Sequence, residues 1–328
     1  MPHFSVVLAT RDRPQLFRKA FDSVLAQTLT EIEVIVVNDG SSPEYQLEYE
    51  SIIHAVASRR VQFFSLIARP KGHGPGYARN FGATKANSPY LCFLDDDDWW
   101  TDPDHLERAL AVIAETDAPV DLYMTNQAAF LHDEQRPGPI WIEDLPAILN
   151  KLSNQPDRHG VHTVVSEELL LSLGFCHLNT LIVRRALFEE IGGFDESIRW
   201  EEDRDLYLRL IDSARIIKYA PLTVARHNIP DPTKRSNLST VHTEFDRRLL
   251  QLRLLDRAII FGRHAAIREY GRRHKSYTLK RIAELLAADG RHVEAAFYAR
   301  EGLGAGPTIK WAAHTAWRTL QGLANRSR

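Results

Sequence analysis

The first 115 residues alternate short apolar runs with amphipathic segments, and this alternation limits the folds that the chain can adopt. Runs rich in β-branched or aromatic residues, typical of buried strands, occupy residues 4–8, 32–37, 61–66 and 89–94. Apolar side chains recur at helical spacing in residues 13–27, 45–57 and 77–86, and Pro103 is predicted to open a further helix that runs to about 115. This order predicts an α/β fold with a mostly parallel sheet flanked by helices.

The pattern is less regular in the middle of the chain. Residues 126–180 are rich in Pro, Asn, His and Gly and predict an excursion that lines one side of a cleft. Regular elements return at residues 179–183 and 185–191. Residues 201–211 then predict a helix, whose acidic first turn suits the helix dipole. A polar stretch at 233–240 predicts a loop.

The last part of the chain is basic and helical in pattern. From about Glu244 it is rich in Ala and Leu and is broken by glycines, and residues 276–302 have the pattern of one tetratricopeptide-like helix hairpin. Residues 241–328 carry 17 Lys and Arg against 8 Asp and Glu, a balance of +9, whereas residues 1–240 have a balance of −11. A basic tail of this kind indicates an anionic partner.

Cysteine content and hydropathy exclude several protein classes. Two cysteines, Cys92 and Cys176, are too few for a disulfide framework and fit a reducing compartment. The N-terminal residues lack the cationic leader and long apolar stretch of a signal peptide, and no window has the apolar length of a membrane span. We therefore expect a soluble cytoplasmic protein.

The strongest candidate for chemistry is the run of four aspartates at 95–98, directly after an apolar strand. Such carboxylates repel one another unless a cation offsets their charge. Ligands of open α/β sheets bind beyond the carboxyl ends of the strands, and carboxylate oxygens select Mg²⁺ or Mn²⁺. The run therefore predicts a metal site completed by phosphate oxygens. The alternative is a solvated charge run, which the adjacent Trp99 and Trp100 disfavour.

Two polar motifs follow the first two predicted strands. Asp39 lies in the sequence Asn-Asp-Gly-Ser-Ser, where its carboxylate can accept a hydrogen bond from a nucleobase N–H, unless the motif is a plain turn. Thr10, Arg11 and Arg13 follow the first strand. The arginines can contact a base or a phosphate, unless they are surface charges at a helix start.

Two more motifs lie further along the chain. The glycine-rich residues 72–82 let the backbone approach a ligand, and Arg79 can reach anionic oxygens. No Gly-Lys-Ser/Thr follows, which disfavours a P-loop. Trp200 precedes Glu201, Glu202 and Asp203 at a predicted helix start, where a carboxylate can act as general base unless it only caps the helix.

In this order and spacing, the motifs resemble family 2 glycosyltransferases of the GT-A fold. The resemblance covers residues 3–230 and rests on Thr10-Arg11, Asn38-Asp39-Gly40-Ser41, Ala78-Arg79-Asn80, Phe93-Leu94 with the four aspartates, Gly192-Gly193-Phe194-Asp195-Glu196 and Glu202-Asp203-Arg204-Asp205-Leu206. It implies a GT-A type, Rossmann-like sheet. Residues 1–125 would bind the nucleotide-sugar, 126–235 the acceptor, and 240–328 would form a helical extension.

The resemblance also implies roles for single residues. The nucleotide-binding set is Thr10, Arg11, Arg13, Asp39, Arg79, Asp95 and Asp96. Within it, Asp39 would bind the base, usually uracil, and Asp95 would face the ribose as the first acid of an Asp-x-Asp pair. Asp97 and His227 would bind the metal. The aspartate that binds the metal can also lie one position away from Asp97 within the run of four.

For the reaction itself, the resemblance implies an inverting transfer from a nucleotide-diphosphate sugar, with UDP as the expected nucleotide and Mn²⁺ or Mg²⁺ as cofactor. Asp203 would be the general base. Trp99, Trp100, Trp200 and Glu202 would lie near the acceptor, whereas the sequence assigns no role to Trp141. The acceptor would be a hydroxyl of a glycan or lipid-linked glycan.

The C-terminal helices and the rival functions leave alternatives open. Trp311, Trp317 and Leu320 alternate with cationic residues, which fits contact with an anionic membrane, packing on the catalytic domain, or packing on a second subunit. Nothing indicates nucleic-acid binding. The rivals to a glycosyltransferase are a sugar nucleotidyltransferase, whose glycine- and lysine-rich signature is missing after the first strand, and a non-catalytic binding module.

Overall fold

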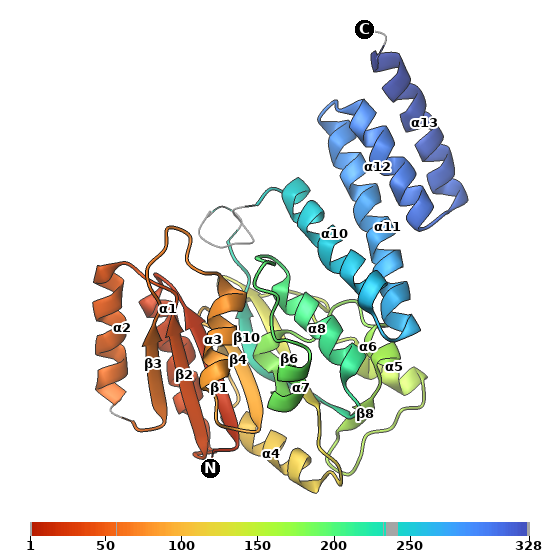
Figure 1. The fold of residues 1–328 in the computed structure, drawn as a ribbon. Coiled ribbons are helices and arrows are strands. Elements are labelled where there is room, and N and C mark those ends of the chain that lie inside the picture. The colour runs from red at the N-terminus through yellow and green to blue at the C-terminus, as the bar shows by residue number, and fades with distance from the viewer. Residues whose placement is uncertain (1, 57, 232, 234–241, 327–328) are drawn as a thin grey trace. The chain divides into compact units, whose positions relative to one another are not determined.

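The computed structural model describes residues 2–56, 58–231, 233 and 242–326. The chain divides into two compact units, Met1–Asp231 (unit 1) and Pro232–Arg328 (unit 2). Unit 1 is an α/β domain and unit 2 consists of helices, as the alternation and the later helical pattern predict (Figure 1). The two units are described separately.

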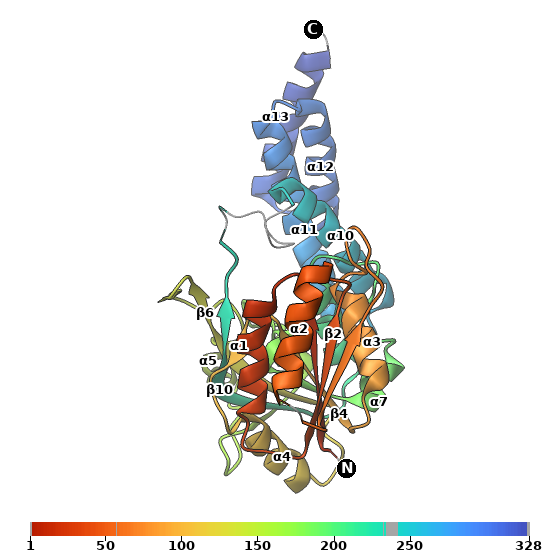
Figure 2. The ribbon, with the colours of Figure 1, turned by 90° about the vertical axis from the view of Figure 1, so that its left-hand side faces the viewer.

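Unit 1 begins with the predicted strand–helix repeats. Its first strands are parallel, in the spatial order β3-β2-β1-β4, and comprise β1 (Phe4–Thr10), β2 (Ile32–Asn38), β3 (Val61–Ser65) and β4 (Tyr90–Asp95). They are connected by α1 (Pro14–Leu25), α2 (Pro43–Val56) and α3 (Pro75–Lys85). Helices α1 and α2 lie on one face of these strands and α3 lies on the other (Figure 2).

Alternating side chains of β1 explain how both faces of this sheet are covered. Val6 and Leu8 belong to the core that also contains Phe17 of α1. Val7 points to the opposite face, toward α3, where Gly82 permits a close approach. A Cβ at Gly82 would lie only 2.5 Å from Val7 Cγ1. The helix therefore packs directly on the strands whose ends carry the polar motifs.

The second half of unit 1 extends the same sheet. The order continues from β4 through β9 (Leu181–Arg184), β6 (Leu122–Leu131), β10 (Ile217–Asn228) and β5 (Trp99–Trp100). Two short strands, β7 (Glu134–Gln135) and β8 (His162–Val164), pair with β6 and β10. The remaining elements are α4 (His105–Glu115), α5 (Leu145–Lys151), α6 (Ser166–Leu169), the 3₁₀ turn η1 (Leu178–Thr180), α7 (Arg185–Glu190) and α8 (Glu202–Ser213).

Three details differ from the expectations. The predicted excursion at 126–180 contains most of β6, an internal strand, so the proposed division between 125 and 126 falls within a strand. Strand β10 was not predicted, because Pro221 interrupts its sequence pattern. In the structure its pairing with β6 also has two register shifts. Helix α4 begins at His105 rather than Pro103, because residues 103–104 form a turn.

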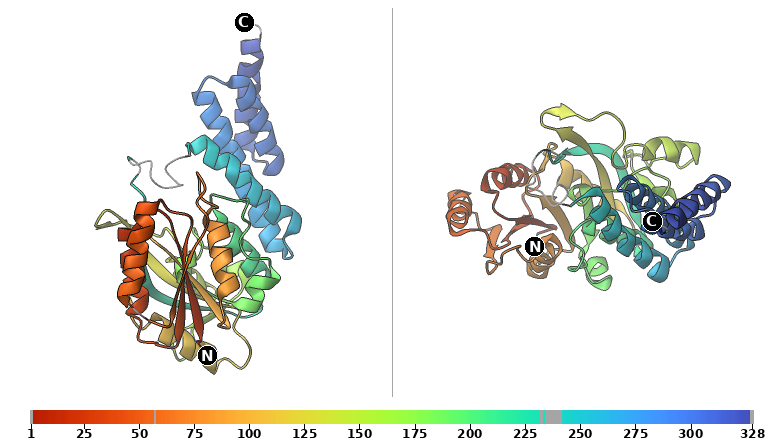
Figure 3. Two further views of the ribbon diagram at one scale, coloured as in Figure 1. Left: turned by 60° about the vertical axis from the view of Figure 1, so that its left-hand side comes forward. Right: turned by 90° about the horizontal axis from the view of Figure 1, so that it is seen from above.

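Unit 2 contains four helices in its described residues, and each packs on the next along the chain (Figure 3). They are α10 (Glu244–Phe261), α11 (Ala265–Ala288), α12 (His292–Ala305) and α13 (Ile309–Arg326). Gly262, Gly290 and Gly306 lie at the three breaks, which confirms the glycine-broken helical pattern. Helices α11 and α12 form the predicted hairpin, with wider bounds than 276–302.

Two further expectations concern unit 2 and the segment before it. Apart from Thr233, the predicted loop at 233–240 lies outside the described residues. Among the residues that the structure describes, no helix combines the length and the apolar character that crossing a membrane requires.

Candidate active site

The polar motifs meet at one edge of the sheet because three of the strands before them are adjacent and parallel. Thr10 at the end of β1 pairs with Asn38 of β2, and Ala9 pairs with Asp95 of β4. The carboxyl ends of these strands therefore place Asp39, the arginines after β1 and the four aspartates along a common edge. This is the position at which open α/β sheets bind their ligands.

Two of the aspartates are held by residues that follow β1. The Thr10 hydroxyl donates to Asp96 Oδ2 at 2.6 Å, and the Arg13 guanidinium forms ion pairs with Asp96 and with Asp97, the latter at 2.9 Å. Asp96 is buried. Burial, which outweighs the attraction of Arg13, raises the pKa of Asp97 to about 7. The neighbouring aspartates raise this pKa further, so a second cation beside Asp97 would favour its charged form.

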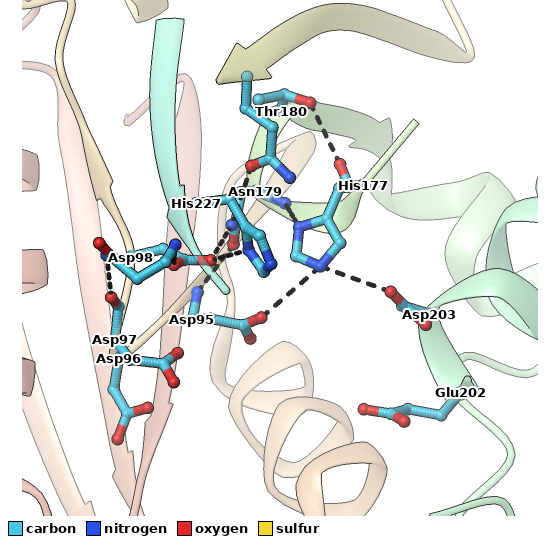
Figure 4. Close-up of polar contacts among 12 residues, drawn as sticks. Asp95, Asp96, Asp97, Asp98, His177, Asn179, Thr180, Glu202, Asp203 and His227 are labelled. Carbon is cyan, nitrogen blue, oxygen red and sulfur yellow. Dashed lines mark hydrogen bonds and ion pairs between the residues drawn. The ribbon is translucent and has the colours of Figure 1, made fainter. Parts of the chain in front are cut away.

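Asp98 is bound by the opposite side of the site. His227 Nδ1 lies 2.7 Å from Asp98 Oδ2, the Asn179 side chain donates to the same oxygen at 2.6 Å, and the Asn228 backbone N–H donates to Oδ1 at 2.7 Å (Figure 4). Burial opposes the charge of His227, but Asp98 raises the pKa of this histidine to about 9. The structure thus places His227 beside Asp98 rather than beside Asp97.

Arg79 of α3 pairs with a carboxylate at the end of β4 and with another at the start of α8. Its guanidinium is buried, and it donates to Asp95 Oδ1 at 2.6 Å and to Glu202 Oε1 at 2.7 Å. Burial opposes ionisation of Asp95, but Arg79 holds the pKa of that carboxyl below its ordinary value. Burial raises the pKa of Glu202. Arg79 and Glu202, predicted to contact the nucleotide and the acceptor, form an ion-paired bridge from β4 to α8 in this structure.

Asp203 lies across the site from Asp95, with His177 between them. Glu201 adopts a positive φ of 60° at the start of α8, and the chain then presents Glu202 and Asp203 to the site. His177 Nε2 is 3.5 Å from Asp203 Oδ2 and 3.8 Å from Asp95 Oδ2 (Figure 4). Burial raises the pKa of Asp203 and therefore strengthens it as a base.

Asp39 is bound to the glycine-rich loop after β3. Its carboxylate accepts the backbone N–H groups of His73, at 2.9 Å, and Gly74, at 3.0 Å, and it lies 2.7 Å from the His73 ring Nδ1. Arg11 donates to the carbonyl oxygen of Arg69, at 3.0 Å, in the same loop. The glycine-rich segment therefore folds back on the predicted base-binding residues.

Gly72→Ala tests whether this contact shapes the predicted nucleotide-binding region. An added Cβ would lie 2.4 Å from Asp39 Oδ2, and φ is +61°. We expect UDP affinity to fall about tenfold by calorimetry, because displacement of Asp39 costs about 1–3 kcal/mol. The matched control is Gly160→Ala, where φ is +73° and nothing lies within 4 Å of the added Cβ. Equal UDP affinities for the two variants would contradict this role of the loop.

The four tryptophans near the motifs have different environments. Trp99 is contacted by two cations, with Lys19 Nζ 3.6 Å and Arg226 Cζ 4.7 Å from its ring centre. Trp100 is 4% exposed and donates to the Asn179 carbonyl oxygen, so its ring presents no face to a sugar, which corrects its predicted acceptor role. Trp200 is partly exposed. Trp141, which had no assigned role, packs 4.6 Å from the His177 ring and 5.0 Å from the His227 ring.

The donor atoms at this edge fit a hard divalent cation. Carboxylate oxygens of Asp95, Asp97 and Asp98 lie within 4.8 Å of one another, and so do ligand atoms of Asp98, His177 and His227. The first set offers only carboxylate oxygens, the second offers one carboxylate and two imidazoles, and Asp98 is common to both. Carboxylate oxygens suit Mn²⁺ or Mg²⁺. The predicted ligands Asp97 and His227 belong to different sets, so their pairing on one metal stays a prediction.

Sequence reasoning missed His177 and Asn179, which organise the site. Both belong to a buried stretch, FCHLNTLIV, where an isolated histidine or asparagine gives no periodic signal. Asn179 accepts the Asp95 backbone N–H at 3.0 Å and donates to Asp98, so it connects both ends of the acidic run. A detectable signal was the placement of two hydrogen-bonding residues in an otherwise apolar run, since buried polar groups require partners.

The family model for glycosyl transferase family 2 matches residues 5–191, more than half of the chain. The chain belongs to glycosyl transferase family 2. This confirms the family resemblance drawn from the motifs. The match ends before Glu202 and Asp203, so the roles predicted for these two residues stay proposals.

Relatives of this family 2 chain include proteins named for polysaccharide biosynthesis. "Succinoglycan biosynthesis protein ExoW" of Rhizobium meliloti is 32% identical over 185 residues, which are 54% of this chain and 53% of that protein. "Amylovoran biosynthesis glycosyltransferase AmsB" of Erwinia amylovora is 26% identical over 211 residues, 63% of each chain. The chain therefore spans between half and two thirds of these relatives.

The family 2 chain also has the fold of solved glycosyltransferases. S. aureus TarS 1–349 in complex with UDP-GlcNAc superposes with a TM-score of 0.67 at 16% identity, over 98% of this chain and 89% of that one. Mannosyltransferase PcManGT from Pyrobaculum calidifontis, in complex with GDP-Man and Mn²⁺, has a TM-score of 0.60 at 17% identity, over 98% and 85%. These neighbours confirm the predicted GT-A fold.

Proposed function

We propose that the chain is an inverting glycosyltransferase that moves a sugar from a nucleotide-diphosphate donor, a UDP-sugar, to a hydroxyl of a glycan or lipid-linked glycan. Family membership supports sugar transfer and disfavours a nucleotidyltransferase. Two structures similar in fold are complexes with UDP-GlcNAc and with GDP-Man. ExoW and AmsB are named for the biosynthesis of succinoglycan and amylovoran, which motivates a surface glycan as product.

One observation carries the mechanism: two carboxylates from different elements face the same point. Asp95 ends β4 on the donor side and Asp203 lies in the first turn of α8, and both are within 3.8 Å of His177 Nε2. A donor held along the aspartate edge would present its anomeric carbon toward Asp203. An acceptor hydroxyl between the two would then lie within reach of a base.

In this scheme Asp203 removes the proton from the acceptor hydroxyl. The hydroxyl oxygen forms a bond to the anomeric carbon from the face opposite the diphosphate, and the bond from that carbon to the diphosphate oxygen breaks. A single displacement inverts the anomeric configuration. Asp203, with its raised pKa, is a stronger base than an exposed aspartate. Arg13 provides a fixed positive charge beside the diphosphate region, because it is paired with Asp96 and Asp97.

Asp97 and His227 would hold a divalent cation together with Asp98, which belongs both to the carboxylate set with Asp95 and Asp97 and to the set with His177 and His227. When bound, Mn²⁺ or Mg²⁺ would neutralise negative charge on the diphosphate. Asp39 would bind the uracil with the oxygen lone pairs left by His73 and Gly74, next to Arg11. Trp200, partly exposed before α8, and Trp99 would lie on the acceptor side.

Donor hydrolysis tests the inverting mechanism without a known acceptor. Purified protein with Mn²⁺ is incubated with UDP-GlcNAc, UDP-glucose, UDP-galactose and GDP-mannose, and nucleotide release is measured. The anomer of the released sugar is followed by proton NMR before mutarotation. Inversion of an α-linked donor gives the β-anomer first. Initial release of the α-anomer would contradict a single displacement.

The metal site predicts that UDP binding requires a divalent cation. We expect calorimetric titration to show UDP binding with Mn²⁺ and a loss of about tenfold or more without it, because the phosphate charges then face uncompensated carboxylates. Asp97→Asn should weaken the Mn²⁺-dependent binding by a similar factor. Asp22→Asn, an exposed carboxylate on α1, is the control and should bind as wild type does. Metal-independent binding would contradict the proposed site.

A membrane contact, an oligomer and a cytoplasmic location remain proposals based on the sequence. The charge balance of +9 in residues 241–328 supports an anionic surface as the partner of unit 2. Sedimentation with vesicles of phosphatidylglycerol, compared with phosphatidylcholine, tests this contact.

A further inference from the structure

His177 lies between a carboxylate of the donor side, Asp95, and the candidate base, Asp203. It precedes η1, its side chain is 6% exposed, and its ring lies between Trp141, at 4.6 Å, and His227, at 5.2 Å. This packing fixes the plane of the ring. The direction in which its two nitrogens point is therefore a property of the fold.

The hydrogen bonds of the ring define its tautomer. His177 Nδ1 accepts the backbone N–H of Asn179, at 3.4 Å, so this nitrogen carries no proton. In the neutral ring the proton then lies on Nε2. That nitrogen faces two acceptors, Asp203 Oδ2 at 3.5 Å and Asp95 Oδ2 at 3.8 Å. One N–H group can make a short, linear hydrogen bond to only one of them.

Asp203 has a second anchor that makes this contact matter. Its Oδ1 accepts the backbone N–H of Arg204 at 2.8 Å. A carboxylate held at one oxygen can still rotate about that bond. A donor at Oδ2 would fix both oxygens and leave a lone pair of defined direction for the acceptor proton.

We propose that His177 is a positioning residue for Asp203, and that ribose hydroxyls of a bound nucleotide engage Asp95 and release the Nε2–H of His177 to Asp203. This inference rests on the proposed function and adds a coupling to it. Donor binding orients the base before the acceptor reacts. Both Nε2 contacts are longer than a normal hydrogen bond in the free protein, as expected of a group shared between two acceptors.

The kinetic test compares two substitutions at His177. His177→Gln retains an N–H near the position of Nε2, whereas His177→Leu retains volume but no donor. With the UDP-sugar selected by the hydrolysis screen, we expect His177→Leu to lower kcat about tenfold or more and to change the donor KM by less than about threefold. His177→Gln should restore at least about a third of the wild-type kcat.

Two kinetic outcomes and one calorimetric outcome would overturn the proposal. A kcat of His177→Leu within about twofold of wild type would remove the role. A Gln variant as slow as the Leu variant would make the residue a packing element. A loss of Mn²⁺ affinity in both variants, measured by calorimetry in the presence of UDP, would make His177 a metal ligand with Asp98 and His227 instead.

An NMR experiment separates this inference from the proposed function. The protein has fourteen histidines, so ring-¹⁵N-labelled protein is recorded by long-range ¹H–¹⁵N correlation, and His177 is assigned from its absence in His177→Gln. We expect the neutral Nε2–H tautomer in the free protein and a shift of this nitrogen on UDP addition. Asp203→Asn should reduce that shift. An Nδ1–H tautomer, or a His177 signal that does not respond to bound UDP, would overturn the coupling even if sugar transfer is confirmed. Failure of every donor in the hydrolysis screen would count against the proposed function alone.

Discussion

Asp203→Asn should reduce turnover about 10³-fold while leaving Mn²⁺-dependent UDP affinity unchanged, because a general base contributes about 10²–10⁴-fold to rate. Asparagine has nearly the same shape and can still accept the Arg204 N–H, but it cannot take up the acceptor proton. The measurement is kcat with the selected donor, together with calorimetric titration of UDP. A loss of kcat without loss of nucleotide binding identifies an interaction made only in the transition state.

The control for this variant lies two residues away on the same helix. Asp205 pairs with Arg209, at 2.8 Å and 2.7 Å, and is buried. Asp205→Asn should lower the free energy of unfolding and leave kcat almost unchanged. If Asp203→Asn transfers sugar at near the wild-type rate, Asp203 is not the base. Glu202 would then be the next carboxylate to test.

Arg79→Met should destabilise unit 1 by about 3–5 kcal/mol, because it removes the ion pairs of the buried Glu202 and the partly buried Asp95. Arg79 donates to Asp95 at 2.6 Å and to Glu202 at 2.7 Å, and methionine fills a similar length without charge. The measurement is the free energy of unfolding from urea titration. Arg18→Met is the control, since Arg18 and Asp22 are about half exposed and such pairs contribute less than about 1 kcal/mol.

The pH dependence of this destabilisation has a defined sign. Arg79 lowers the folded-state pKa of Asp95, so the stability from this pair is present above the unfolded pKa of an aspartate and is lost as pH falls. In Arg79→Met the pKa values of Asp95 and Glu202 rise, and protonation at low pH relieves the penalty. The difference between variant and wild type should therefore be larger at pH 8 than at pH 5. A difference independent of pH would indicate a packing defect.

The first half of the fold follows from local sequence signals. Strands β1 to β4 can be predicted because each is a short apolar run bounded by turn residues. Helices α1 to α3 can be predicted because their apolar residues recur at helical spacing. Strands β6 and β10 escape it for physical reasons. Buried Thr125, Asn126 and Gln127 give β6 a polar sequence, and Pro221 breaks the period of β10.

The same distinction applies to the site. Asp95, Asp97 and Asp203 could be named as candidates, because acidic residues after a strand or at a helix start are visible in the sequence; their roles stay predictions. The long-range contacts that connect these residues could not be predicted from the sequence. Arg79 reaches Glu202, which is 123 residues away, and His177 reaches both Asp95 and Asp203 only through the fold. Long-range partners of this kind depend on strand order, which no local pattern encodes.

Strand β10 determines when the site can form during folding. It is the last strand of unit 1 in the chain, yet it lies between β6 and β5 inside the sheet, and it supplies His227 and Asn228 to Asp98. Strands β1 to β4 can pair as soon as about residue 95 has been synthesised. The contacts of Asp98 with His227 and Asn228 can form only after residue 228 has been synthesised. A nascent chain would thus carry Asp98 without its contacts to His227 and Asn228 until β10 inserts. Because pairings between distant residues form slowly, insertion of β10 should be the late step in assembly of the catalytic edge.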